Sequence, residues 1–310
     1  MDNLNPRFWR QLRQASLDVL LQDELNHFSL VAGNRWLRKR VEYPIVSIVH
    51  HLRSSEQHPS AWNQFYRWVE RQYLRTIDAF IFNSPSTRRV VWSLVEPRDS
   101  VVARPSGRRF GEPISRERIS ARAHQPGPLR VLFIGNVIPR KNLHALIRGL
   151  SGLDADRWRL HAVGDLTVDE RYAARIRRDV SKSNVADHVQ LHGAVSDQYL
   201  HTLLEQSHVL AVPSTYEGYG IVYVEGMGHG LPALATPQGG PVDLIDDGVT
   251  GFLVEPPLDA AIADHIRTLD DDRERLATMG LSAREAYVDF PTWEDTGRTV
   301  TDFLEHLTGP

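Results

Sequence analysis

Short runs rich in β-branched and aromatic residues alternate along this chain with longer segments of helical periodicity. In the first part of the chain such runs predict strands at residues 45–50, 79–83 and 101–103. In the second part they predict strands at residues 130–134, 159–163, 189–192, 208–212, 232–236 and 251–254. The alternation is typical of parallel sheets with crossover helices, so we expect an α/β protein.

Polar residues mark the predicted starts of several helices. Ser84 before Pro85 is a favourable N-cap, because proline fits the first helical position. Further caps are predicted at Asn142, Ser196 and Asp259, and residues 271–307 are expected to be helical.

A proline- and glycine-rich stretch, Gln125–Pro128, predicts the boundary between two domains at residues 1–124 and 125–310. Six predicted strands make the second domain a complete doubly wound sheet, whereas the first has three and lacks a glycine-rich first turn. We therefore expect two Rossmann-like doubly wound domains, the N-terminal one incomplete, with the last helices running back toward it.

Composition narrows the class of protein. The chain has 310 residues, 41% of them hydrophobic and 24% charged, as in globular proteins with two cores of ordinary size. It has no cysteine, so disulfides and thiolate chemistry are excluded. No apolar run reaches the length of a membrane span, and we expect a cytoplasmic protein.

Charge is distributed unevenly between the two predicted domains. Residues 1–124 carry 20 Lys plus Arg against 12 Asp plus Glu, a net charge of +8, and the rest of the chain is acidic. The basic part would suit an anionic surface or acceptor, or it is ordinary solvated surface. An amphipathic, arginine-rich helix near Phe8, Trp9 and Leu12 suggests peripheral contact with the inner membrane face; packing of these residues in a core is the alternative.

The segment Glu217–Glu225, EGYGIVYVE, carries the most specific chemistry. Gly218 and Gly220 remove the Cβ atoms that would block a ligand where a helix begins, and the amides of Tyr219, Gly220 and Ile221 then form an anion site. A carboxylate beside such a site repels phosphate unless it binds neutral hydroxyls, which favours a sugar nucleotide over a bare nucleotide. Taken alone, EGYG would be read as a glycine-rich helix start with solvated glutamates.

This segment resembles the retaining GT-B glycosyltransferases of family four, also called group 1 glycosyltransferases, in which two glutamates flank seven residues. Residues 133–150, 189–200 and 232–256 are similar to further motifs of that family, in the same order. PIVSIVHHL and FIFNSPSTRRVV look like later strands of its acceptor domain, while its glycine-rich first loop has no counterpart here. The resemblance implies a GT-B fold with two domains facing a cleft.

The resemblance also implies roles for individual residues. Lys141 matches the lysine that neutralises the donor diphosphate, Glu217 the first family glutamate and His50 the histidine that reaches toward the donor sugar; these three are the expected catalytic residues. Asn136 stands where the family often has arginine, and Arg140 is expected to supply that charge. The expected donor-binding residues are Gly135, Asn136, Arg140, Lys141, Val195, Glu217, Gly218, Tyr219, Gly220, Ile221 and Glu225.

Other side chains near these motifs are weaker candidates. His51, Arg53 and Glu56 are further cleft residues, and Gly239 with Gly240 is expected to form a turn that lets the backbone approach the ligand. As isolated features, the histidines would be structural hydrogen-bonders and the Arg140–Lys141 pair an exposed loop.

The expected function is retaining, metal-independent transfer from a UDP-, GDP- or ADP-sugar to a hydroxyl of a glycan, lipid or small molecule, with no cofactor. The alternative is a sugar-nucleotide-binding subunit that is inactive alone and is completed by a second copy or a partner chain. An epimerase or phosphorylase on the same fold is a third option. No motif of dinucleotide oxidoreductases, P-loop kinases or metal sites is present, and nucleic acid is not an expected partner.

Overall fold

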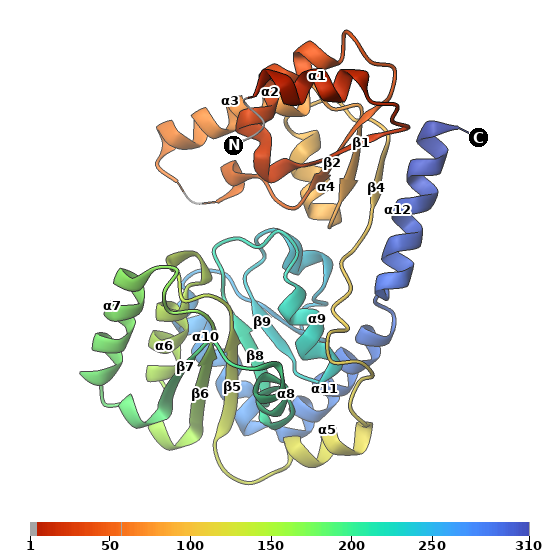
Figure 1. Ribbon diagram of the computed structural model, residues 1–310. Coiled ribbons are helices and arrows are strands. Elements are labelled where there is room, and N and C mark those ends of the chain that lie inside the picture. Colours follow the sequence, from red (N-terminus) through yellow and green to blue (C-terminus); the bar gives the residue numbers. More distant parts are fainter. Residues whose placement is uncertain (1–4, 57, 310) are drawn as a thin grey trace. The chain divides into compact units, whose positions relative to one another are not determined.

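The computed structural model describes residues 5–56 and 58–309. The chain divides into two compact units: unit 1 is residues 1–105 with 291–310, and unit 2 is residues 106–290 (Figure 1). The expected boundary at 124/125 differs from this division, because α5 (Arg116–Ala123) packs on α11 (Arg273–Val288) within unit 2. The final helix, α12 (Trp293–Thr308), packs on β4 (Ser100–Val102) and belongs to unit 1.

Unit 1 is built on a parallel sheet in the order β1-β2-β3-β4. Its two central strands, β2 and β3, are buried on both faces, which explains the largely apolar runs in the sequence. One face forms a core with α1 to α4, and the other packs against apolar residues of α12. The elements are α1 (Pro6–Gln14), β1 (Leu20–Asp23), α2 (His27–Leu37), β2 (Ile45–Val49), α3 (Ser60–Leu74), β3 (Ala79–Phe82), α4 (Pro85–Trp92), β4 (Ser100–Val102) and α12 (Trp293–Thr308).

Strand β1 was missed in the sequence because a polar residue occupies its buried position. Gln22 is buried, and its side-chain amide exchanges hydrogen bonds of 2.8 and 2.9 Å with that of Asn34 on α2. This paired amide replaces the apolar residue by which a strand is usually recognised.

Helix α1 turns its apolar side chains inward. Trp9 is 8% exposed and lies against Gly33 of α2, where a Cβ would come within 1.9 Å of the indole ring. Phe8 and Leu12 pack on the same core. Packing of these three side chains on the core of unit 1, the alternative named for this helix, is therefore confirmed.

Unit 2 contains a parallel sheet in the order β10-β9-β8-β5-β6-β7, with a single large core. All six strands predicted for this half of the chain are present. The elements are α5, β5 (Leu129–Ile134), α6 (Leu143–Ser151), β6 (Trp158–Val163), α7 (Glu170–Ser181), β7 (Val189–Gly193), α8 (Asp197–Gln206), β8 (Val209–Val212), α9 (Ile221–Gly228), β9 (Ala233–Ala235), β10 (Gly251–Leu253), α10 (Leu258–Asp271) and α11 (Arg273–Val288).

Two of the predicted helix caps are confirmed. The Ser84 and Ser196 side chains accept hydrogen bonds from the amides of Thr87 and Tyr199. Asn142 does precede α6, but it is left-handed (φ 59°) and its side chain makes no capping bond. The cap at Asp259 is wrong: Pro257 is the N-cap of α10, and the Asp259 carboxylate accepts a hydrogen bond from Arg148 instead.

Candidate functional site

The sheet of unit 2 has a switch point between its neighbouring strands β5 and β8. From β5 the chain continues outward through β6 and β7, and from β8 it continues the other way through β9 and β10. The loops that follow β5 and β8 therefore leave in opposite directions at the carboxyl edge of the sheet. Doubly wound α/β proteins bind ligands at such a point.

The loop after β5 contains Gly135, Asn136, Arg140 and Lys141. Gly135 has φ +154°. A Cβ atom built on Gly164, at the end of β6, would lie 1.9 Å from the carbonyl oxygen of Gly135. The turns after these two strands are thus in direct backbone contact. Asn136 is exposed beside them, whereas Lys141 lies in a short helical turn and directs its ammonium toward the loop after β8.

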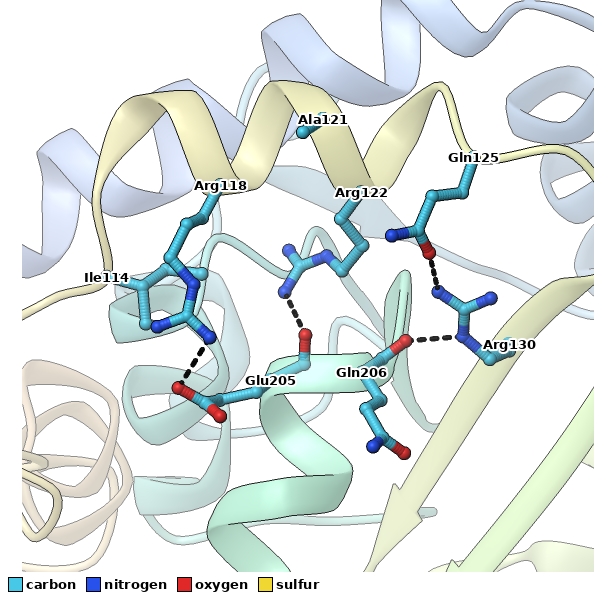
Figure 2. Close-up of a pocket in the computed structure, with 8 residues that line it drawn as sticks. All are labelled: Ile114, Arg118, Ala121, Arg122, Gln125, Arg130, Glu205 and Gln206. Atoms are coloured by element: carbon cyan, nitrogen blue, oxygen red, sulfur yellow. Dashed lines mark hydrogen bonds and ion pairs between the residues drawn. The ribbon is translucent and has the colours of Figure 1, made fainter.

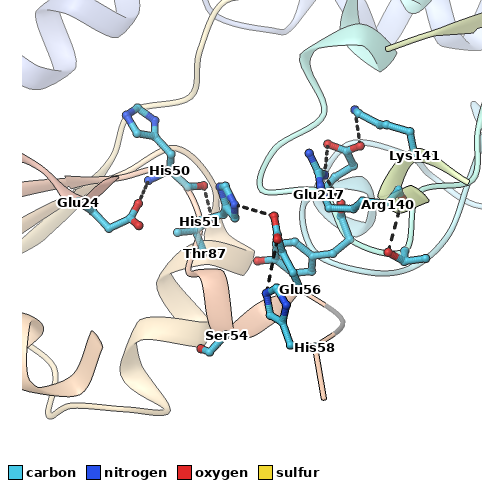
Figure 3. A network of polar contacts seen from close by, with 12 residues as sticks. Glu24, His50, His51, Ser54, Glu56, His58, Thr87, Arg140, Lys141 and Glu217 are labelled. Carbon is cyan, nitrogen blue, oxygen red and sulfur yellow. Dashed lines mark hydrogen bonds and ion pairs between the residues drawn. The ribbon is translucent and has the colours of Figure 1, made fainter. Parts of the chain in front are cut away.

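The carboxylate of Glu217 is held between the two loops (Figure 3). Its Oε1 lies 2.5 Å from Lys141 Nζ and accepts a hydrogen bond of 2.6 Å from Ser214 Oγ, while Arg140 Nη1 is 3.6 Å from Oε2. Burial would raise the pKa of Glu217, but Lys141, Ser214 and Arg140 outweigh it and hold the pKa below its usual value. Glu217 is therefore an ionised carboxylate, and two cations adjoin it.

Glycines bring the backbone of the loop after β8 close to the turn that follows β9. Glu217 donates its amide to Gln238 O, and Gly240 donates its amide to Glu217 O at 2.8 Å. Gly239 has φ +86°, and a Cβ there would lie 2.0 Å from Glu217 O. The expected Gly239–Gly240 turn is thus present, and it contacts the backbone of Glu217 in the loop after β8.

Helix α9 starts beside Glu217. Gly220 is its N-cap in a left-handed conformation (φ +95°), and the first helical residue is Ile221. The N–H groups of a first turn have no acceptor inside the helix and carry the positive end of its dipole. The expected Gly218–Ile221 segment thus lies at a helix N-terminus, next to Lys141 and Arg140.

Glu225 lies on α9, and its side chain is 6% exposed. Arg109 Nη1 is 3.9 Å away and also bonds to Asp197 at the start of α8. Burial raises the pKa of Glu225 to about 7, Arg109 opposes this shift, and Asp197 adds to it. Val195, which precedes α8, is half-buried against the core of unit 2.

The candidates of unit 1 form a separate polar cluster, whose labelled side chains are also drawn in Figure 3. His50 and His51 follow β2: His50 Nε2 is 3.6 Å from Asp23 Oδ2, and His51 Nε2 is 3.2 Å from Glu56 Oε1. Arg53 stacks on the ring of Tyr66 at 4.9 Å.

Sequence reasoning missed Glu24 in this cluster. Glu24 is 1% exposed, and its carboxylate accepts a hydrogen bond of 3.3 Å from the backbone amide of His50. Burial raises the pKa of Glu24 to about 7, although the attraction of His51 opposes this shift. A cavity of 230 Å³ is lined by Glu24, Leu25, His27, Phe28, His51, Arg53 and Glu56. The signal in the sequence was the acidic pair Asp23–Glu24 at the end of β1, which became informative only once that strand was recognised.

A larger hollow of 620 Å³ in unit 2 is lined by three arginines, Arg118, Arg122 and Arg130 (Figure 2). Arg122 donates to the carbonyl of Glu205, and Arg130 to that of Gln206, at the end of α8. Arg118 pairs with the Glu205 carboxylate at 2.9 Å. These groups cap a helix C-terminus and tie α5 to the sheet, so the hollow has a structural explanation.

The fold and the site together define a doubly wound α/β protein with two cationic side chains, a carboxylate and a helix N-terminus at its switch point. Residues 115–286 match the family described as glycosyl transferases group 1, and residues 3–108 match the description Glycosyltransferase Family 4. The first match covers more than half of the chain, which therefore belongs to the group 1 glycosyl transferases.

Relatives and solved structures agree with this assignment. The chain is 27% identical over 269 residues to the GDP-mannose-dependent alpha-(1-6)-phosphatidylinositol monomannoside mannosyltransferase of Mycobacterium tuberculosis, covering 82% of this chain and 69% of that protein. Sucrose-phosphate synthase from Thermosynechococcus elongatus superposes with a TM-score of 0.80 at 21% identity, covering 97% of this chain and 77% of that one. Anabaena HepE in complex with UDP and glucose gives 0.77 at 21% identity, covering 98% and 80%.

These structures confirm the GT-B fold class. The chain spans between 48% and 69% of the length of the first curated relatives it matches.

Proposed function

We propose that this chain binds the nucleoside diphosphate sugar of a glycosyltransferase and takes part in transferring the sugar to an acceptor hydroxyl. The observation that carries the proposal is the meeting of Lys141, Arg140 and Glu217 at the switch point between β5 and β8, beside the N-terminus of α9. The two cations and the helix dipole favour an anion, and the carboxylate favours hydroxyl groups. A diphosphate that carries a sugar combines both requirements.

Within this proposal, the diphosphate lies against the start of α9, with Lys141 and Arg140 as its counter-charges. Glu217 holds Lys141 in position and accepts sugar hydroxyls, and Glu225 accepts the ribose hydroxyls. Gly135, Asn136 and Val195 border the nucleotide. HepE, which shares the fold, has been solved with UDP and glucose, and the mycobacterial relative is named as GDP-mannose-dependent; these facts support a UDP- or GDP-sugar.

The proposed chemistry retains the configuration at the anomeric carbon. The bond from that carbon to the diphosphate oxygen breaks and its electron pair stays on the phosphate, whose charge Lys141, Arg140 and the α9 amides stabilise without a metal ion. The acceptor oxygen bonds to the same face of the carbon, and its proton passes to the departing phosphate. Among the described residues, no group of three His, Asp or Glu side chains is placed to hold a metal.

The acceptor side is proposed for unit 1, around His50 and the neighbouring cavity. His50 is half-exposed and neighbours Asp23, while Glu24, Glu56 and Arg53 supply hydroxyl-binding groups. A glycan, a lipid head group or a small polyol would suit these groups.

Ligand binding by the purified chain tests the donor proposal. The panel consists of UDP, GDP and ADP, each with and without a hexose. At least one of these compounds should raise the melting temperature of the protein by mass action. Lys141→Met should abolish this rise, whereas Arg148→Met, which removes an exposed partner of Asp259, should preserve it. A panel without any stabilising compound would refute the donor site.

Catalysis is tested separately by NMR of the product anomer in the presence of EDTA. Transfer with retention supports the full proposal. Donor binding without hydrolysis or transfer favours the second candidate, a binding subunit that a partner chain or a second copy completes. Loss of transfer on chelation, or an inverted product, would contradict the proposed chemistry.

A further inference from the structure

Glu225 is a buried carboxylate to which the protein itself offers a charge but no hydrogen bond. Its side chain is 6% exposed. Among the described residues, the carboxylate has one ion-pair partner, Arg109, and no hydrogen-bond donor. A buried carboxylate is costly unless charges or donors compensate it. Its oxygens are therefore open to hydrogen bonds from a ligand.

The guanidinium of Arg109 is held in place by Asp197, at the first position of α8. Arg109 Nε donates to Asp197 Oδ2 at 3.3 Å, and Nη2 bonds to the other carboxylate oxygen. Such a two-point pairing fixes the plane of the guanidinium. At 3.9 Å, its Nη1 lies beyond hydrogen-bond distance from Glu225 Oε1. Arg109 thus attracts the Glu225 carboxylate by its charge and leaves the carboxylate oxygens unoccupied.

The backbone on both sides of Arg109 is fixed to unit 2. A Cβ built on Gly107 would lie 2.4 Å from Cβ of Val224, the residue before Glu225 on α9. Two residues after Arg109, Tyr287 Oη of α11 donates a hydrogen bond of 2.6 Å to the carbonyl of Gly111. The distance between the Arg109 guanidinium and Glu225 is therefore set by the packing of this segment on α9 and α11.

We infer that Arg109 is a positioning residue for the nucleotide, which favours the ionised form of Glu225 and leaves its oxygens open to the ribose hydroxyls. The inference rests on the proposed donor site, in which Glu225 accepts those hydroxyls. An ionised carboxylate only accepts hydrogen bonds, whereas a protonated one carries an O–H donor in place of an acceptor. Arg109 therefore acts through Glu225 and need not touch the donor.

The charges around Glu225 make this role dependent on pH. Burial raises the pKa of Glu225 to about 7, while Arg109 lowers it and Asp197 raises it further. Without Arg109, the pKa would be higher and Glu225 would be mostly protonated at neutral pH. Tyr287, which also interacts electrostatically with Glu225, has a pKa raised above 10 by burial, and burial lowers the pKa of His229 on α9 to about 4. Neither group titrates near pH 7.

Calorimetric titration with UDP-glucose, GDP-mannose and ADP-glucose at several pH values tests the inference. A diphosphate that is esterified at both ends does not titrate near neutral pH, so the pH dependence reports on the protein. The affinity of the wild type should rise as pH increases through about 7, because only ionised Glu225 binds the ribose. Arg109→Met should weaken binding about five- to tenfold at about pH 6.5 and less than twofold at about pH 8.5.

Two further variants separate this role from a structural one. Arg109→Lys keeps a cation, so it should recover most of the affinity at about pH 6.5. In a Glu225→Gln background, Arg109→Met should have no effect that depends on pH, because the titrating group is gone. Other groups, such as His201 of α8, are present in every variant, and their titration cancels in this comparison.

The chain offers a closely matched control pair. Arg267 and Asp264 are 44% and 69% exposed, compared with 46% and 69% for Arg109 and Asp197. Arg267→Met removes an equally exposed cation from α10, and it should bind the three sugar nucleotides with the pH profile of the wild type.

The outcomes distinguish this inference from the proposed function. If Arg109→Met is folded by circular dichroism and binds with the profile of the wild type, or with the same loss at every pH, Arg109 does not act through Glu225. The donor site would then stand and the inference alone would fail. If the wild type binds none of the three sugar nucleotides at any pH, the proposed donor site is wrong, and the inference falls with it.

Discussion

Lys141 Nζ lies 2.5 Å from Glu217 Oε1, although the two residues belong to loops that follow different strands of the unit 2 sheet. The Lys141 and Glu217 side chains are only 13% and 9% exposed, so this is a buried ion pair. It is one of several polar links between the β5 and β8 loops at the proposed donor site. Its strength therefore bears on both stability and function.

Replacing one residue of this pair should lower the free energy of unfolding more than replacing both residues. Lys141→Met leaves a buried carboxylate with only Ser214 and Arg140, and we expect a loss of about 2–4 kcal/mol in the free energy of unfolding. Adding Glu217→Gln should restore part of that loss. Urea unfolding of the two single variants and the double variant measures the coupling.

The exposed pair Arg148–Asp259 serves as the control for this cycle. Its side chains are 54% and 46% exposed, and Arg148→Ala should change stability by less than about 1 kcal/mol. Additive effects of the Lys141 and Glu217 substitutions would mean that the two side chains do not interact in solution.

Gly239 should tolerate no side chain, because its backbone touches the loop of Glu217. Gly239→Ala combines the cost of φ +86° with a clash at 2.0 Å against Glu217 O. Gly248 has a similar φ of +77° but nothing within 4 Å of a built Cβ, so Gly248→Ala isolates the conformational cost, about 1–2 kcal/mol. Thermal unfolding should show a clearly larger loss of stability for Gly239→Ala than for Gly248→Ala, and Gly239→Ala should also lose nucleotide binding. Equal losses of stability in the two variants would disprove the close approach of Gly239 to the Glu217 backbone.

Glu225 should make the stability of the protein fall as pH rises. Burial raises its pKa from 4.5 to about 7, so between these values the folded state holds a proton that the unfolded state releases. The stabilisation is complete below about pH 4.5 and is lost as pH rises through about 7. Glu225→Gln removes this dependence, so the variant should gain on the wild type by up to about 3 kcal/mol across the window.

The comparison must be made between the variant and the wild type in the same buffer at each pH. His229 has the opposite effect, since burial lowers its pKa to about 4 and its contribution is lost as the pH falls. A stability difference between Glu225→Gln and the wild type that is constant from about pH 4.5 to about pH 8 would show that Glu225 titrates normally.

Much of the fold could be predicted because parallel strands are buried on both faces. Runs such as Ile45–Val49 and Leu129–Ile134 are apolar except for one residue each, Ser47 and Arg130, and each run that was recognised proved to be a strand. Strand β1 was not predicted, because its stability rests on the pairing of Gln22 with Asn34, which no local pattern reveals. The domain boundary differed for the same reason: Arg122 of α5 bonds to His229 and Gly230, more than 100 residues away.

For the candidate site, the sequence by itself determined which residue types are present and in what order: the spacing of Glu217 and Glu225, the glycines around them and the lysine after β5. These features are local, and local backbone geometry depends on nearby residues. Only the tertiary structure decided that Glu217 pairs with Lys141 and that Glu24 is buried with a raised pKa. Burial and charge pairing depend on neighbours that are distant along the chain, so they are settled only when the sheets and helices pack.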